Sequence, residues 1–180
     1  MQPALTTTPT PVVRSMIRAL ALAWLALSPA AAFASALAAP GERVVLRITG
    51  NLERTNDGDA AAFDLAQLGA LPQTTVKTVT PWTEGVTEFR GPLAREVLGH
   101  VKARGIRVRA TAINDYVIEI PIADFDSYDV ILAIARDGKP MGIRDRGPIW
   151  VIYPWSEHPE LQNEVYHGRS IWQLESLVVE

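Results

Sequence analysis

The sequence predicts an α+β fold: a single compact domain of mixed β-sheets with a few short helices. About seven short β-branched or apolar segments are separated by turn residues, a spacing typical of strands. Only two or three segments have the apolar spacing of a helix, and each is short. The 180 residues contain no internal repeat and no linker-like stretch. We therefore expect one domain after the N-terminal segment.

Residues 1–38 have the pattern of a secretory signal peptide. Basic residues come first, an apolar run follows, a proline interrupts the run and small residues end it. The two candidate cleavage sites are Ala34-Ser35-Ala36 and Ala36-Leu37-Ala38. We favour cleavage after Ala38, which leaves 39–180 as a periplasmic domain. The alternative is an uncleaved N-terminal membrane anchor.

The first half of the domain predicts three strands and two helices. Asp64 suits the N-cap of a short helix that Pro72 ends. Pro92 suits the first turn of a longer helix, which Gly105 ends. In order, the expected elements are a strand over 43–50, a turn at 56–59, a helix over 64–71, strands over 73–80 and 86–90, and a helix over 92–105.

The second half predicts mainly strands. Ile113-Asn114-Asp115 suits a hairpin turn because asparagine and aspartate tolerate left-handed backbone geometry. The expected elements are hairpin strands over 106–112 and 116–121, buried strands over 130–135 and 149–153, a short helix within 157–166 and a last strand over 170–179. Asp124, Asp126 and Asp129 lack the glycine and glutamate of a calcium loop, so we assign them to turns and helix caps.

The composition excludes several classes of function. The chain has no cysteine, which excludes disulfides, thiol catalysis and iron–sulfur clusters. Its 17 Lys and Arg against 20 Asp and Glu do not favour nucleic-acid binding. His158 and His167 lie among glutamates that could supply metal ligands, but their spacing matches no compact metal motif, and we favour a solvated charged loop. Trp82 and Trp155, each beside a proline, are the better candidates for a ligand pocket.

A series of short motifs runs from residue 63 to residue 171. In order they are Phe63-Asp64-Leu65-Ala66-Gln67-Leu68, the strand leading to Trp82, Phe89-Arg90-Gly91-Pro92-Leu93, Asn114-Asp115-Tyr116, Ile120-Pro121-Ile122, Asp137-Gly138-Lys139-Pro140-Met141, Gly147-Pro148-Ile149 and Gly168-Arg169-Ser170-Ile171. This order resembles the molybdopterin-binding domain of the sulfite oxidase and methionine-sulfoxide reductase family. The resemblance covers most of the mature chain and implies the same α+β fold.

The sequence also departs from the pattern of this family at two points. Its active members hold molybdenum through a cysteine at the end of the strand before the residue matching Trp82, and Thr78 lies nearest that position here. A hydroxyl is a much weaker ligand than a thiolate, so we expect no molybdenum centre of the usual kind. Arg14 and Arg18 are not adjacent, unlike the twin arginines of family enzymes that are exported with their cofactor bound.

The resemblance implies a cofactor-binding region in which six residues converge: Thr78, Trp82, Asp115, Tyr116, Arg169 and Ser170. A guanidinium binds anions through paired hydrogen bonds, so Arg169 is the residue we expect to bind an anionic ligand. The alternative is that Arg169 pairs with a surface acid such as Glu164.

Three functions follow from these observations. We favour a non-catalytic exported member of the fold that binds a small molecule, an anion or a partner protein, with a membrane sensor as one candidate partner and nucleic acid excluded. The second is a molybdopterin-dependent oxidoreductase, or a subunit of one, without cysteine ligation. The third is a purely structural interaction module. We expect no cofactor, and molybdopterin is the alternative that the resemblance keeps open.

Overall fold

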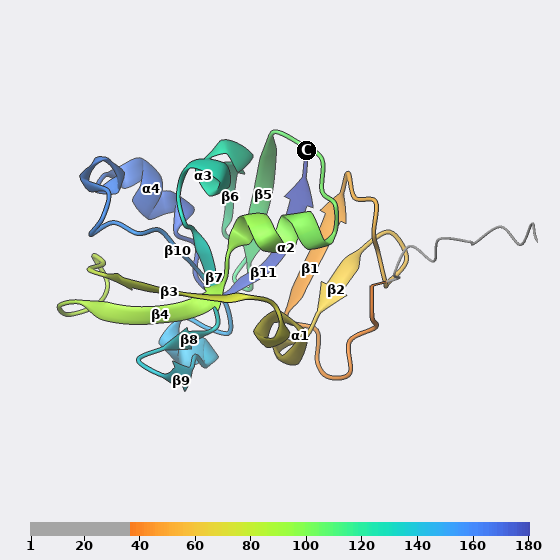
Figure 1. Cartoon of the computed structure of the whole chain (residues 1–180), viewed down its shortest axis with the longest axis horizontal. Helices are drawn as coiled ribbons and strands as arrows, with labels where there is room; N and C mark the ends of the chain where they lie inside the picture. The colour runs from red at the N-terminus through yellow and green to blue at the C-terminus, as the bar shows by residue number, and fades with distance from the viewer. Residues whose placement is uncertain (1–36) are drawn as a thin grey trace, which may run out of the picture. The chain divides into compact units, whose positions relative to one another are not determined.

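Three β-sheets form the framework of residues 37–180, which are the part of the chain that the computed structural model describes (Figure 1). The largest sheet has the strand order β2-β1-β11-β5-β6. Its strands are β1 Leu46–Gly50, β2 Ala61–Phe63, β5 Arg107–Ala112, β6 Val117–Pro121 and β11 Leu174–Val179. β1 and β11 are parallel, whereas the other neighbours are antiparallel. The expected mixed sheet is confirmed.

The other two sheets are antiparallel and smaller. One has the order β3-β4-β8-β9, and the other pairs β10 with β7. Their strands are β3 Gln73–Thr78, β4 Thr87–Pro92, β7 Ile131–Ala133, β8 Ala135–Arg136, β9 Lys139–Pro140 and β10 Trp150–Ile152. β4 passes so close to β7 that a Cβ at Gly91 would overlap the carbonyl of Leu132, so only glycine fits there.

Four short α-helices accompany the sheets in the described part of the chain. They are α1 Leu65–Ala70, α2 Ala94–His100, α3 Ile122–Ser127 and α4 Glu164–Arg169, with 3-10 turns η1 Ile143–Asp145 and η2 Pro159–Leu161. Asp64 caps α1 as expected: its carboxylate accepts from the backbone N–H of Gln67 at 2.7 Å. This hydrogen bond is the main reason that the pKa of Asp64 lies below its ordinary value. α2 lies across the five-stranded sheet (Figure 1) and buries Val97 and Leu98, and its C-cap residue Val101 is also buried.

Several expected elements have different limits. Pro92 belongs to β4, where it pairs with Gln73, and not to the helix that follows. The expected strand over 130–135 is two strands, β7 and β8. β7 pairs with β10 and β8 pairs with β4, and the change of partner occurs at Ile134. Helix α3, which contains Asp124, was not predicted as a helix. The last strand begins at Leu174 instead of Ser170, after Gln173 adopts a left-handed conformation with φ 53°.

Most of the expected signal peptide, residues 1–36, lies outside the described residues. Its last two residues are described, and they contact the domain. Leu37 is 7% exposed and packs in the core. The carbonyl of Ala38 accepts hydrogen bonds from the side chains of Asn56 at 2.7 Å and Gln67 at 2.9 Å. Within the described part, no helix is both long enough and apolar enough to cross a membrane.

Candidate ligand-binding cavity

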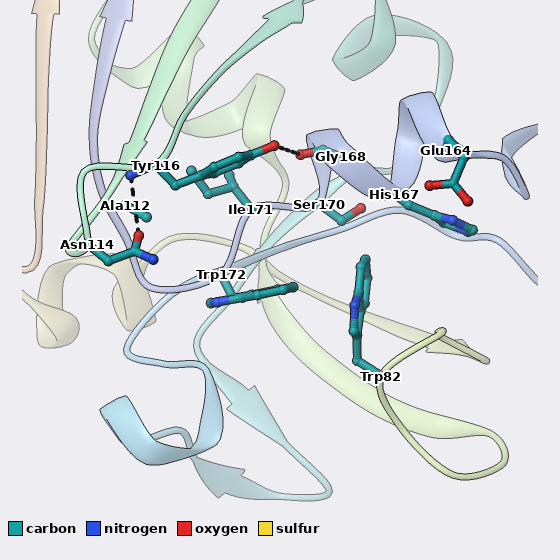
Figure 2. A pocket seen from close by; sticks show the side chains of 10 residues that line it. All are labelled: Trp82, Ala112, Asn114, Tyr116, Glu164, His167, Gly168, Ser170, Ile171 and Trp172. Atoms are coloured by element: carbon teal, nitrogen blue, oxygen red, sulfur yellow. Dashed lines mark hydrogen bonds between the residues drawn. The ribbon is translucent and has the colours of Figure 1, made fainter.

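A cavity of about 350 Å³ lies where the β5–β6 turn, helix α4 and the loop between β3 and β4 meet (Figure 2). It is lined by Trp82, Ala112, Asn114, Tyr116, Glu164, His167, Gly168, Ser170, Ile171 and Trp172. These residues come from three separate stretches of the chain. The volume falls at the lower end of the range of small-molecule sites in proteins.

Trp82 is held in the β3–β4 loop by local hydrogen bonds and by other rings. Its backbone N–H donates to the hydroxyl of Thr80 at 3.1 Å. Its indole meets that of Trp172 at a centroid distance of 5.3 Å and an angle of 75°, and it contacts the buried Trp150 at 5.8 Å. The edge-to-face contact with Trp172 stabilises a fixed orientation of the Trp82 ring. Figure 2 shows the two indoles meeting as a corner at one side of the cavity.

The β5–β6 turn supplies the opposite side of the cavity. Asp115 adopts the expected left-handed conformation with φ 64°, and the amide oxygen of Asn114 accepts from the backbone N–H of Tyr116 at 3.3 Å. Tyr116 reaches across toward α4 (Figure 2), where its hydroxyl donates to the carbonyl of Gly168 at 3.4 Å. The bond is long and Tyr116 is 46% exposed, so it links the two elements weakly.

Helix α4 places Glu164 and His167 on the cavity. Asn163 caps the helix by accepting hydrogen bonds from the backbone N–H groups of Val165 and Tyr166. Glu164 and His167 are three residues apart, which puts them on the same side of a helix. His167 also contacts the ring of Trp82 at a centroid distance of 5.9 Å. Within the described part of the chain, the carboxylate of Glu164 forms no ion pair.

The other side of α4 is closed by a buried polar cluster. The guanidinium of Arg169 donates to the carboxylate of Asp124 at 2.8 Å, and the hydroxyl of Tyr153 donates to the same oxygen at 2.8 Å. Arg169 also lies over the ring of Tyr166, 5.2 Å from its centroid. Burial, together with the Asp124 carboxylate, raises the pKa of Tyr153 far above its ordinary value. Asp124, Tyr153, Tyr166 and Arg169 are called the Asp124 cluster below.

Three of the six residues expected in a cofactor region line the cavity: Trp82, Tyr116 and Ser170. Asp115 is exposed in the adjoining turn. Arg169 does not line the cavity, and its acidic partner is Asp124, not Glu164. Trp155, the other tryptophan favoured as a pocket residue, is 1% exposed in the core and does not line the cavity, but its ring contacts those of two lining residues, Trp82 and His167.

Thr78 lies buried at the end of β3, where its hydroxyl forms hydrogen bonds to the neighbouring loop. Its oxygen accepts from the backbone N–H of Ser156 at 3.0 Å and donates to the hydroxyl of Ser156 at 3.2 Å. The backbone N–H of Val79 donates to the same Ser156 hydroxyl at 3.1 Å. These bonds join β3 to the segment after β10, which is a sufficient structural reason for a hydroxyl at residue 78.

The residues of this region do not fit a molybdopterin centre of the family type. The position that the resemblance places nearest the family's metal ligand offers the hydroxyl of Thr78, already engaged by Ser156, in place of a thiolate. A pterin phosphate requires cationic or backbone donors, whereas the acidic Glu164 lines the cavity and, among the described lining residues, there is no lysine or arginine.

Sequence reasoning missed four polar or aromatic lining residues: Asn114, Glu164, His167 and Trp172. The sequence predicts a short helix within 157–166, which contains Glu164, and His167 lies just beyond it in a stretch interpreted as a solvated charged loop. The helix instead begins at Glu164, capped by Asn163, and it carries both side chains to the cavity. Trp172 was assigned to a strand, and nothing local indicated that it lies before the strand begins.

No protein-family model matches the chain, and no curated protein matches it. The functional argument therefore rests on the cavity and the residues around it.

Proposed function

We propose that the chain is an exported, non-catalytic protein with the molybdopterin-binding-domain fold of the sulfite oxidase family, and that it binds a small molecule in the cavity beside Trp82. One observation carries this proposal: Trp82, Tyr116 and Ser170, picked out by the resemblance, line one cavity. The corner formed by Trp82 and Trp172 offers apolar area, and Glu164 and Asn114 offer polar groups that orient a ligand. A membrane sensor is the candidate partner that would detect the bound state.

Binding is tested by ligand-observed NMR with a library of small molecules. Wild-type protein should bind members of the library, and Trp82→Ala should lose them because the aromatic corner is removed. Val86→Ala is the matched control, since Val86 lies in the same loop, is 68% exposed and does not line the cavity. Circular dichroism checks that each variant folds, and Trp82→Phe replaces Trp82→Ala if that variant does not. Hits that bind all variants equally, or no hits at all, would overturn the proposal.

The non-catalytic part of the proposal is tested by metal and pterin analysis of protein purified from its native periplasm. The hydrogen bonds between Thr78 and Ser156 support a structural role at the position nearest the metal ligand. We expect no stoichiometric molybdenum. One molybdenum per chain, with bound pterin, would instead support the molybdopterin-dependent oxidoreductase.

Export requires a cleavage site that leaves the folded domain intact. Cleavage after Ala38 would remove Leu37 from the core and the Ala38 carbonyl from its two hydrogen bonds. Burial of a leucine side chain is worth about 1.5–3 kcal/mol, so these contacts favour the site Ala34-Ser35-Ala36. N-terminal sequencing of the exported protein should therefore begin at Leu37. A mature protein that begins at Ala39 would show that these contacts are dispensable, and one that begins at Met1 would contradict cleavage.

A further inference from the structure

The charges around the cavity differ from those of an anion site. Glu164 is the lining side chain with a full negative charge, and the described lining residues include no lysine or arginine. The one arginine of α4, Arg169, is paired with Asp124 on the other side of the helix. A ligand with a negative charge would meet the carboxylate of Glu164, and among the described lining residues the imidazole of His167 is the one group that could offer a positive charge in return. A ligand with a positive charge would find a partner in that carboxylate.

The aromatic rings favour the same sign of charge. A cation is attracted to the face of an indole within about 6 Å of the ring centroid. The same group of rings already binds one cation of the protein: the guanidinium of Arg146 lies 5.3 Å from the ring centroid of Trp150 and 5.5 Å from that of Trp172. Arg146 does not line the cavity. No such cation, within the described part of the chain, lies over Trp82.

We propose that the ligand of this cavity is a small organic cation of the quaternary ammonium class, bound against the indoles of Trp82 and Trp172 with the carboxylate of Glu164 as its counter-charge. This inference rests on the proposed function and adds the chemical class of the ligand. A quaternary ammonium group donates no hydrogen bonds, so it suits a corner of indoles better than a primary ammonium does. The cavity of about 350 Å³ limits the ligand to a compact molecule.

The test compares three probes by isothermal titration calorimetry: choline, its uncharged tert-butyl isostere and inorganic phosphate. The isostere has nearly the same shape without the charge, so the difference between it and choline measures the contribution of the charge. We expect choline to bind about tenfold more tightly than the isostere. We expect no binding of phosphate.

Two variants assign the binding to the two parts of the site. Trp82→Ala should weaken choline binding by at least about tenfold, because a ring face is lost. Glu164→Gln should weaken it by about threefold and should remove most of its dependence on ionic strength, because the counter-charge is lost. Glu157→Gln is the matched control: Glu157 is an exposed acid in the same region that does not line the cavity, and its loss should leave choline binding unchanged.

The outcomes separate this inference from the proposed function. If the isostere or phosphate binds as tightly as choline and Trp82→Ala abolishes that binding, the cavity binds small molecules but the cationic class is wrong. If choline binds equally well to wild type and Glu164→Gln at every ionic strength, the counter-charge is wrong. If none of the three probes binds while the library yields hits that depend on Trp82, the inference fails and the proposed function stands.

Discussion

The two sides of helix α4 contrast in how their polar groups are satisfied. On one side, the Asp124 cluster joins α4 to α3 and to the segment after β10 through hydrogen bonds of 2.8 Å between side chains that are largely buried. On the other side, Glu164 and His167 line a cavity, and Glu164 has no ion-pair partner within the described residues. One short helix thus carries a stabilising face and a face available to a ligand.

This contrast shows that residue type alone can point to the wrong residue as the one that binds a ligand. Arginine is the residue that the resemblance and the chemistry of anion binding both single out, yet here Arg169 belongs to the stabilising face. Buried polar groups are usually paired within the protein, as Arg169 and Asp124 are, whereas Glu164 is exposed and its carboxylate is accessible to solvent and to a ligand. Whether a side chain is already paired within the protein, more than its residue type, therefore distinguishes Arg169 from Glu164.

The largest expected effect is that of Arg169→Ala on stability. The substitution leaves the carboxylate of Asp124 largely buried without its cation. Removing one partner of a fully buried pair costs about 3–5 kcal/mol, and we expect about 2–3 kcal/mol because the two side chains retain 20% and 10% exposure. Denaturant unfolding measures this loss, and ligand binding by folded Arg169→Ala should be nearly unchanged.

Arg144→Ala is the matched control for that experiment. Arg144 is exposed and forms no ion pair among the described residues, so its loss should change the free energy of unfolding by less than about 0.5 kcal/mol. The sequence-based hypothesis gives the opposite result for Arg169→Ala, with binding lost and the melting temperature nearly unchanged. That result would place Arg169 on the face of α4 that is available to a ligand, and the two faces would no longer differ in the way described above.

A smaller effect is expected from Tyr153→Phe, and it depends on pH. At neutral pH the variant loses the hydrogen bond to Asp124 and should be about 1 kcal/mol less stable. Because the pKa of Tyr153 is raised in the folded state, the unfolded chain releases this proton first as the pH rises above about 10. Wild-type stability therefore falls above that pH, by up to about 1.4 kcal/mol per pH unit for this group.

Urea unfolding across alkaline pH measures the effect. The stability difference between wild type and Tyr153→Phe should shrink as the pH rises, because phenylalanine has no proton to release. Tyr128 also has a pKa raised by burial, so Tyr128→Phe serves as the comparison for a phenol that is not bonded to Asp124. If the stability difference between wild type and Tyr153→Phe stayed constant at all pH values, the pKa of Tyr153 would not be raised by folding, and Tyr153 would not belong to the stabilising face of α4.

Local sequence predicted the parts of the fold that local contacts determine. The cap of α1 by Asp64 joins residues three apart, and the left-handed turn at Asp115 depends on the residues within it. Sequence did not predict the Asp124 cluster, because Asp124 and Arg169 are 45 residues apart and Asp124 lies in α3, a helix without a recognised start signal.

The cavity was predictable in part. Trp82 stood out because a large aromatic beside a proline suits a loop that borders a pocket. Trp172 did not stand out in the sequence. It lies outside the last strand because Gln173, the next residue, adopts a left-handed conformation and β11 begins only at Leu174. Glutamine is seldom found in that conformation, so the sequence carried no signal for it.

The smallest expected effect is that of Tyr116→Phe, which tests whether the cavity side of α4 is as weakly tied as its contacts indicate. The variant removes the 3.4 Å bond to the carbonyl of Gly168 and keeps the ring. Because the bond is long and the residue is exposed, water can replace the lost donor, and the free energy of unfolding should change by less than about 0.5 kcal/mol. Denaturant unfolding beside Tyr153→Phe gives a direct comparison of two tyrosine hydroxyls, one on each side of the helix. A loss for Tyr116→Phe equal to that for Tyr153→Phe would mean that both sides of α4 are held equally, and that the cavity is closed by structure and not left open for a ligand.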